Sequence, residues 1–435
     1  MPEATNGSLD AALSPAVLHS IDQVPGLPND DQKFWWGATV PAFVRLLQDC
    51  QYTEEHQLLY LNWYYRWIIP ALGPRATAAE CPNPRSILVQ DGSQVEFSIK
   101  WKEAKAQRAV RFTIEPTGYE AGTPSDPLNQ KETLKVARAM TPEVQGMDLA
   151  MFEHFITATM VSNEAYEELQ RKDPPRMPAA VSCLAFDLVA GQIGSKAYVL
   201  PRPKSVSTGI SMRDLVYESI RKWDGDRGSY EASVGTFNDY LESFAGVTLD
   251  SVDSPPSVAS VAIDCVDPAA ARVKIYSPTV ARSLGKAKYA FALGGGLKGE
   301  FIDKALAALE DLWVTLFETK DEDKEVFHSD KPPGRCVLAV EMRPNQEPET
   351  KLYLPMINTD MTDAQICAAL EGWFTKRGVP QFANTYRDML SNAFPEHDIL
   401  TGRGLHTYIS FAYTQKEGVS LTTYYSPQIY KYHAV

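Results

Sequence analysis

Long apolar runs are missing from this chain of 435 residues. No stretch of 18 consecutive apolar residues occurs, so no segment has the character of a membrane-spanning helix. The opening residues, MPEATNGSLDAALSP, also lack the basic start and apolar centre of a secretory signal peptide. We therefore expect no membrane partner and a cytoplasmic location.

Positive charge is in deficit. The 42 Lys and Arg residues are outnumbered by 55 Asp and Glu, which gives a formal net charge of −13. Proteins that bind nucleic acid normally present a basic face to its phosphates. We expect no nucleic-acid partner, and any anionic ligand must be bound by a local group of basic side chains.

Paired cysteines and short catalytic signatures are also absent. The six cysteines lie far apart, and no C-x-x-C pair indicates a zinc site. The chain contains no H-E-x-x-H, G-x-S-x-G or P-loop motif. These absences predict reduced thiols and no metal site.

What the chain does contain is a series of paired, strand-like segments. Each pair is rich in Val, Ile, Phe and Tyr and is joined by a short polar or Gly-containing link, which is typical of β-hairpins. The five pairs are 94–101 with 108–114, 180–189 with 194–200, 258–265 with 271–277, 335–343 with 350–357, and 406–414 with 418–425. Helical patterns precede and separate them at 39–68, 149–161, 211–223, 301–318 and 363–378.

Ten antiparallel strands with helices outside avoid exposed sheet edges if they close into a barrel. The length would also suit two or three domains, but a closed architecture of repeated units explains it equally well. We predict an α+β fold with a flexible N-terminus at residues 1–20 and a single barrel domain at residues 21–435. A barrel of more than eight strands can enclose a ligand cavity.

Three Lys-x-Tyr triplets recur on the second strands of these hairpins. They begin at Lys196, Lys274 and Lys351, at intervals of 274 − 196 = 78 and 351 − 274 = 77 residues. The remaining two hairpins carry Arg111-x-Thr113 and Thr422-x-Tyr424 at the matching place. Because alternate residues of a strand share a face, this regular pattern predicts a ring of cations and tyrosines inside the barrel.

Such a ring suits a specific chemistry. Arg111, Lys196, Arg272, Lys274 and Lys351 would be costly to bury without an anion, and a diphosphate meets that need. Aromatic rings stabilise positive charge and exclude water, as an allylic carbocation requires when it leaves its diphosphate. Glu96 lies between apolar residues on the first strand of its hairpin, where alternation allows it to face the interior as a base.

Several longer segments strengthen this reading. They are QKFWW (32–36), LYLNWYYRWIIPALGP (59–74), VEFS (95–98), GTPSDPLNQ (122–130), KAYVLPRPK (196–204), ARVKIY (271–276), GGGLKG (294–299), KLYLP (351–355) and YISFAY (408–413). Through these segments, from about residue 20 to the C-terminus, the chain resembles the dimethylallyltryptophan synthase family of fungal aromatic prenyltransferases. The resemblance implies the ten-stranded α-β-β-α prenyltransferase barrel and the transfer of a dimethylallyl group from dimethylallyl diphosphate to an indole ring, without a metal or another cofactor.

The resemblance also implies roles for individual residues. Glu96 would accept the indole N–H and assist loss of the ring proton, and Ile87 and Leu88 would contact the acceptor. The diphosphate would be bound by Arg111, Lys196, Arg272, Lys274 and Lys351, and the allyl cation would be shielded by Tyr198, Tyr276, Tyr353, Tyr408 and Tyr424.

The acceptor is left open. Ser182 or Cys183 stands where tryptophan-specific members carry a Lys, Ser420 replaces a common cavity Tyr, and the last hairpin is one residue longer. These differences favour a tryptophan-containing cyclic dipeptide or an indole alkaloid over free tryptophan. The alternatives are a phenolic, tyrosine-like or polyketide acceptor, or a non-catalytic carrier of isoprenoid diphosphates. We expect a monomer or homodimer with small-molecule substrates as its only partners.

Overall fold

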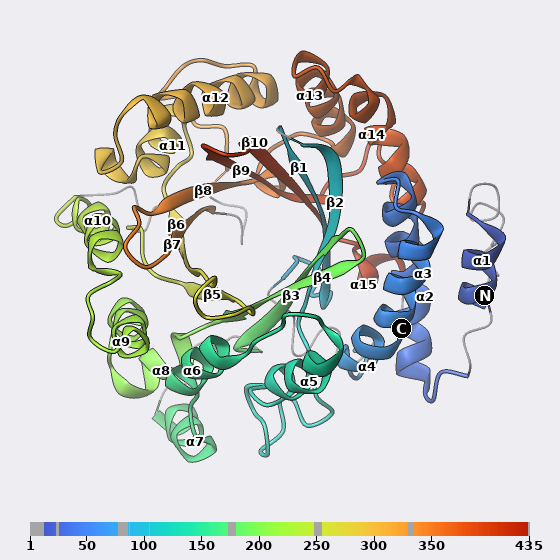
Figure 1. The fold of residues 1–435 in the computed structure, drawn as a ribbon, viewed down its shortest axis with the longest axis horizontal. Coiled ribbons are helices and arrows are strands. Elements are labelled where there is room, and N and C mark those ends of the chain that lie inside the picture. Colours follow the sequence, from blue (N-terminus) through green and yellow to red (C-terminus); the bar gives the residue numbers. More distant parts are fainter. Residues whose placement is uncertain are drawn as a thin grey trace.

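Ten strands form a closed barrel at the centre of the computed structural model, which describes residues 13–22, 26–76, 86, 88–103, 105–172, 180–247, 255–328 and 335–433 (Figure 1). The strands are β1 (Val95–Lys102), β2 (Lys105–Ile114), β3 (Ser182–Val189), β4 (Gln192–Val199), β5 (Ser260–Asp264), β6 (Val273–Thr279), β7 (Cys336–Met342), β8 (Glu349–Pro355), β9 (His406–Thr414) and β10 (Gly418–Tyr425). All neighbours are antiparallel, and β1 pairs with both β2 and β10, which closes the ring. The predicted barrel and its five hairpins are confirmed.

The link between β3 and β4 shows how locally a hairpin is encoded. Ala190 and Gly191 both have positive φ, at 50° and 79°, as a two-residue turn of the I′ type requires. Glycine adopts this conformation without strain, and a Cβ on Gly191 would also lie 2.9 Å from Nε2 of His56, so the His56 side chain would have to move.

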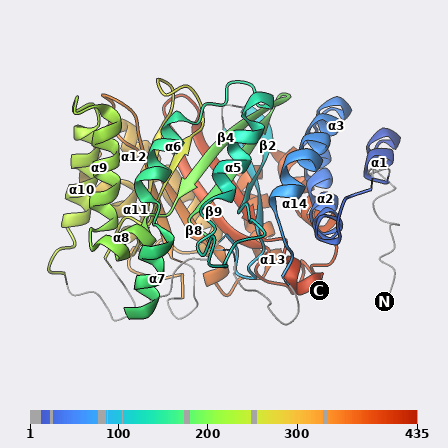
Figure 2. The same cartoon turned by 90° about the horizontal axis from the view of Figure 1, so that it is seen from below.

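Helices surround the strand ring (Figures 1 and 2). The α-helices are α1 (Pro15–Asp22), α2 (Asp30–Asp49), α3 (Glu54–Trp63), α4 (Ile69–Ala71), α5 (Glu132–Met140), α6 (Ala150–Thr159), α7 (Asn163–Lys172), α8 (Arg202–Thr208), α9 (Met212–Asp224), α10 (Glu231–Glu242), α11 (Leu284–Phe291), α12 (Glu300–Phe317), α13 (Asp363–Lys376), α14 (Pro380–Ala393) and α15 (Ile429–Tyr432). Short 3-10 turns occur at Thr141–Glu143, Leu293–Gly295 and Met356–Asn358. Within the described ranges, no helix is both long enough and apolar enough to cross a bilayer.

The first predicted helical stretch, 39–68, differs in detail. Helix α2 begins earlier, at Asp30, because the side chain of Asn29 caps it by accepting from the backbone N–H of Gln32. The chain then breaks after Asp49, and Thr53 caps α3 in the same way. The apolar pattern continues across the break, which lies between the end of α2 at Asp49 and the Thr53 cap of α3.

The predicted division of the chain stays a prediction. Residues 1–12 of the segment expected to be flexible lie outside the described residues. The remainder of that segment contains most of α1, in which Val17 is fully buried.

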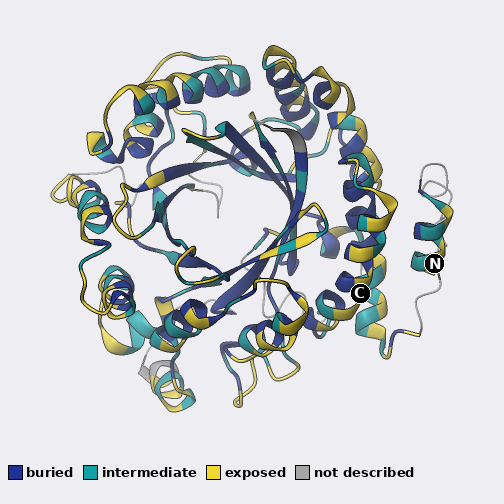
Figure 3. Ribbon diagram, viewed as in Figure 1, coloured by how far each residue is buried: buried dark blue, intermediate teal, exposed yellow. Residues whose placement is uncertain are grey.

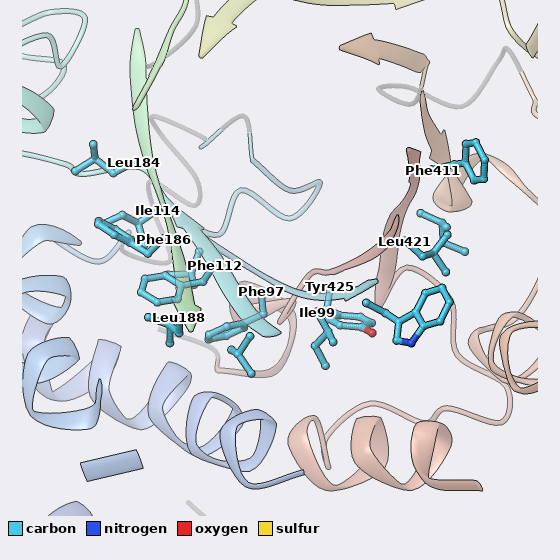
Figure 4. Packing of buried hydrophobic residues seen from close by; sticks show 14 of the residues in the cluster. Phe97, Ile99, Phe112, Ile114, Leu184, Phe186, Leu188, Phe411, Leu421 and Tyr425 are labelled. Atoms are coloured by element: carbon cyan, nitrogen blue, oxygen red, sulfur yellow. The ribbon is translucent and has the colours of Figure 1, made fainter. Parts of the chain in front are cut away.

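The hydrophobic core lies between the outer face of the barrel and the inner faces of the helices. Figure 3 shows buried residues on the side of the helices that faces the strands, and exposed residues on the opposite side. In Figure 4 the apolar side chains of the strands point away from the barrel interior toward the helices. Phe43 of α2, for example, stacks on Tyr64 at 4.5 Å between ring centroids and contacts Phe97 of β1. Because strand side chains alternate, this outward apolar set directs the intervening polar residues into the barrel.

Candidate active site

The predicted site residues of the described chain come together inside the barrel. On β1 and β2, Glu96 lies opposite Thr113, and Ser98 lies opposite Arg111. The interior residues of the other strands include Lys196 and Tyr198 of β4, Arg272, Lys274 and Tyr276 around β6, Lys351 and Tyr353 of β8, Tyr408 of β9, and Tyr424 of β10. Leu88 also lines the cavity described below, whereas Ile87 lies outside the described residues.

Five tyrosines form a continuous aromatic lining, which we call the tyrosine ring: Tyr198, Tyr276, Tyr353, Tyr408 and Tyr424. Ring centroids are 5.5 Å apart between Tyr198 and Tyr276, and 5.8 Å apart between Tyr276 and Tyr353. Tyr353 in turn lies 5.6 Å from Tyr424 and 6.3 Å from Tyr408. All five line one cavity of about 220 Å³. The regular spacing of the Lys-x-Tyr triplets therefore places the phenol rings in mutual contact.

Glu96 also lines this cavity, together with Leu88, Thr113, Cys183, Leu200, Ser260 and Val337. Burial raises the pKa of Glu96 to about 8, although a hydrogen bond from Thr407 and the charge of Arg111 oppose the rise. The hydroxyl of Thr407 donates to Oε1 of Glu96 at 2.8 Å. A carboxyl group with a raised pKa in a cavity is suited to proton transfer near neutral pH.

A β-bulge brings Thr407 to this position. Thr423 pairs with Ile409 and Tyr425 pairs with His406, so two residues of β9, Thr407 and Tyr408, oppose the single residue Tyr424. The extra residue of a bulge re-aims side chains that regular alternation would place on opposite faces. Here it allows Thr407 to reach Glu96 while Tyr408 joins the tyrosine ring.

Deeper in the barrel, the predicted cations contact carboxylates of the protein itself. Arg111 forms a salt bridge with Asp187, and Lys196 contacts the same carboxylate at 2.5 Å. Around the barrel, Lys274 contacts Asp264 at 2.9 Å. Arg272 bridges Asp264 at 2.5 Å and Glu341 at 2.6 Å.

These contacts correct the argument that the cations require an external anion. Burial raises the pKa of Glu341, but Lys274 and Arg272 outweigh it and hold the pKa at about 2. In the same way, Arg111 and Lys196 keep the pKa of Asp187 well below its ordinary value against the effect of burial. Three ionised carboxylates therefore offset much of the predicted positive charge before any ligand binds.

Two lysines are exceptions to this pairing of cations with carboxylates. Lys351 is buried, and its Nζ contacts Oγ1 of Thr422 at 3.4 Å and lies 5.2 Å from the centroid of the Tyr353 ring. Lys100, on the interior face of β1, lies opposite Thr422. Burial lowers the pKa of Lys351 to about 7 and that of Lys100 to about 6, where repulsion from Lys351 and Arg111 contributes. In the described chain, neither lysine forms a salt bridge.

Sequence reasoning missed Lys100, Thr407 and the acidic residues Asp187, Asp264 and Glu341. A signal for the acids was present, since they lie on the first strands of consecutive hairpins at intervals of 264 − 187 = 77 and 341 − 264 = 77. This is the period of the Lys-x-Tyr triplets. Thr407 had no comparable signal, because its contact depends on the bulge.

The comparisons with known proteins agree with this geometry. Residues 31–389 match the family described as tryptophan dimethylallyltransferase. The chain is 36% identical over 443 residues to the prenyltransferase iacE of Pestalotiopsis fici, covering 99% of this chain and 98% of that one. It is 32% identical over 446 residues to a 7-dimethylallyltryptophan synthase of Aspergillus fumigatus, covering 98% and 93%.

Solved structures show the same fold. The crystal structure of AnaPT from Neosartorya fischeri superposes with a TM-score of 0.81 at 26% identity, covering 94% of this chain and 97% of that one. NotF in complex with brevianamide F and DMSPP also gives a TM-score of 0.81, at 25% identity, and covers 95% and 99%. With the family match, the near full-length relatives and the shared barrel in agreement, this chain belongs to the tryptophan dimethylallyltransferase family and is a prenyltransferase.

Proposed function

We propose that this enzyme transfers a dimethylallyl group from dimethylallyl diphosphate to a carbon of an indole ring by electrophilic aromatic substitution, without a metal ion. The observation that carries the proposal is the single cavity in which the tyrosine ring and Glu96 meet above a layer of buried cations. A relative named 7-dimethylallyltryptophan synthase supports the indole acceptor. The structure of NotF in complex with brevianamide F and DMSPP supports an aromatic acceptor and a dimethylallyl diphosphate donor in one barrel.

The first step breaks the bond between the allylic carbon and the diphosphate oxygen, and both electrons leave with the diphosphate. Arg111, Lys196, Arg272, Lys274 and Lys351 would bind this anion, in the role that divalent metals have in other phosphate chemistry. The tyrosine ring then faces the allyl cation. Its phenol rings stabilise the positive charge and keep water from capturing it.

In the second step an indole carbon attacks the cation and forms the new carbon–carbon bond. The ring carbon that was attacked then loses its proton and restores aromaticity. Glu96 would accept the indole N–H during attack and assist this proton loss, which requires its carboxylate form. The hydrogen bond from Thr407 orients Oε1 and leaves the second oxygen for the substrate.

The cavity supports an acceptor that is uncharged around its indole. Among the described residues that line it, Glu96 is the sole Asp, Glu, Lys or Arg. No lining cation of the described chain would bind the carboxylate of free tryptophan, and an unpaired buried charge is costly. We therefore propose a tryptophan-containing cyclic dipeptide or an indole alkaloid as the preferred acceptor. A non-catalytic carrier does not fit a chain that belongs to an enzyme family.

The central test is Glu96→Gln. We expect turnover of the preferred indole acceptor to fall by about a hundredfold or more, because the amide cannot accept the proton. Binding of dimethylallyl diphosphate, measured separately, should persist. Glu153→Gln, on the surface of α6, is the matched control and should retain full turnover. Undiminished product formation by Glu96→Gln would exclude Glu96 as the base.

The acceptor is tested by supplying free tryptophan, tryptophan-containing cyclic dipeptides and phenols with dimethylallyl diphosphate, followed by mass analysis. We expect the cyclic dipeptides to exceed free tryptophan by about tenfold or more in kcat/KM. Equal turnover of both would contradict this preference, and a preference for phenols would contradict the indole acceptor. The same assay in EDTA should show full activity, since the proposed mechanism needs no metal.

A further inference from the structure

The buried charges of the barrel follow a register rule. Each cation on the second strand of one hairpin lies directly opposite an acid on the first strand of the next hairpin. The three pairs are Arg111 with Asp187, Lys196 with Asp264, and Lys274 with Glu341. We call these six residues, with Arg272, the charge belt. Arg111 forms a salt bridge with its opposed acid, and Lys274 lies 4.0 Å from Glu341. Lys196 interacts with the charge of Asp264, although its own salt bridge is to Asp187.

The rule stops at the next two positions. Lys351 of β8 lies opposite Ala412 of β9, where the preceding hairpins would supply an acid. Thr422 of β10 lies opposite Lys100 of β1, where the ring of strands closes. At the first position alanine stands where an acid would follow the rule, and at the second position Lys100 faces Thr422. Nζ of Lys351 also contacts Thr422, so both lysines lie near this residue.

The charge count shows the consequence. Among the described residues, six cationic side chains occupy this level of the interior: Lys100, Arg111, Lys196, Arg272, Lys274 and Lys351. Three carboxylates, those of Asp187, Asp264 and Glu341, oppose them. With every cation protonated the surplus is 6 − 3 = 3 positive charges, which is close to the charge of a diphosphate. Two of these three charges would lie on Lys100 and Lys351, which lack a directly opposed acid, and the third comes from Arg272, which shares Asp264 and Glu341 with other cations.

We propose that Lys100 is a further diphosphate-binding residue, and that diphosphate binding is accompanied by proton uptake at Lys100 and Lys351. This inference rests on the proposed function, because it assumes that the interior binds diphosphate. It adds to the proposed diphosphate site a residue on β1, outside the Lys-x-Tyr series. It also couples the charge of the bound ligand to the protonation of Lys100 and Lys351.

The pKa values of the two lysines support the coupling between diphosphate binding and protonation. With pKa values of about 6 and 7, Lys100 and Lys351 are mostly neutral at pH 7.5. The charged groups that act on them are Arg111, Lys102, Lys274, Asp187 and Glu341. The arginine and the two carboxylates keep their charge at this pH.

An incoming anion favours the ammonium form and raises both pKa values, so protons must be taken up. We expect about one to two protons for each diphosphate bound at pH 7.5. Lys196, which contacts Asp187 and has a pKa of about 8, is mostly protonated beforehand and contributes little.

The test is calorimetric titration of the enzyme with inorganic diphosphate at pH 7.5 in buffers of different ionisation enthalpy, which measures the protons taken up. In Lys100→Met the uptake should fall by about one proton and the affinity by about tenfold. Lys100→Arg stays charged, so it should bind diphosphate with nearly wild-type affinity but with reduced uptake. The matched control is Lys135→Met on the surface of α5, where Lys135 pairs with Glu132.

The outcomes separate the inference from the proposed function. Reduced uptake in both Lys100 variants, with wild-type uptake in Lys135→Met, supports the inference. Wild-type uptake in both Lys100 variants overturns it while leaving the diphosphate site intact. If diphosphate does not bind the wild-type enzyme at all, the diphosphate site of the proposed function is itself wrong.

Discussion

Glu96 and Glu341 are both enclosed by the barrel, yet their pKa values lie on opposite sides of the ordinary value. Glu96, at the level of the tyrosine ring, has a pKa of about 8, and Glu341, in the charge belt, has a pKa of about 2. Burial acts in the same direction on both, since it raises the pKa of a carboxyl group. The difference comes from cross-strand neighbours: Thr113 lies opposite Glu96, whereas Lys274 lies opposite Glu341. Register therefore decides which carboxyl can exchange a proton near neutral pH and which serves as a fixed charge.

The strongest test of this comparison is a carboxyl-to-amide change at each level. Asp264→Asn removes the carboxylate that contacts both Arg272 and Lys274. We expect the free energy of unfolding to fall by about 3 to 5 kcal/mol at pH 7, because the buried Lys274 and the partly buried Arg272 each lose a partner. Urea unfolding monitored by circular dichroism measures the change.

Glu96→Gln should behave in the opposite way. The folded-state pKa of Glu96 lies above its unfolded value. Its favourable contribution to the free energy of unfolding is therefore complete below about pH 4 and is lost as the pH rises toward 8. The amide removes this loss, so the variant should be at least as stable as the wild type at pH 8. The pKa of Asp264 is lowered in the folded protein, so its contribution is present at neutral pH and is lost only in acid. Equal destabilisation by both changes would show that the two levels do not differ.

The tyrosine ring can be tested separately from the charges. Tyr276 lies between Tyr198 and Tyr353, with hydroxyl contacts of 3.4 Å and 3.5 Å. Tyr276→Leu should lower kcat by about 30-fold, because loss of a desolvated cation-π contact costs about 2 kcal/mol. Tyr276→Phe keeps the π-face and is the control, with an expected loss of no more than a few fold. Similar losses in both variants would mean that the hydroxyl, and not the ring, matters.

The smallest expected effect concerns Thr407. Thr407→Val removes the hydroxyl that donates to Glu96, and the pKa of Glu96 should rise further because this hydrogen bond lowers it. With dimethylallyl diphosphate saturating, kcat/KM for the acceptor should increase with pH up to about 8 in the wild type. The variant should lose about tenfold at pH 7, equivalent to ~1.4 kcal/mol, and its profile should move to higher pH.

A purely structural role would leave that pH profile in place. Thr407→Ser should restore the wild-type profile, since it retains a hydroxyl donor. Thr113→Val, the same substitution at the residue opposite Glu96, provides the matched comparison and should not shift the profile. A shift in Thr113→Val equal to that in Thr407→Val would argue against a specific contribution of the bulge.

Much of this enzyme follows from local sequence pattern. Alternating apolar residues predicted all five hairpins, and the same period of two placed Glu96 and the cations on the interior face, because neighbours along a strand are fixed by backbone geometry. The regular spacing of the triplets likewise predicted that Tyr198, Tyr276 and Tyr353 face a common space, and their rings are in contact.

Tertiary structure alone decided what those side chains contact. Arg111 forms a salt bridge with Asp187 and Arg272 with Glu341, each between two hairpins, and Lys100 comes under the charge of Lys351 because β1 closes the ring onto β10. These contacts join residues far apart in the chain, so they depend on the register between hairpins. Neither the alternation of side chains along a strand nor the composition of the chain determines that register. The sequence by itself therefore determined which residues face the interior, whereas closure of the barrel decided which charges are balanced and which remain available for a ligand.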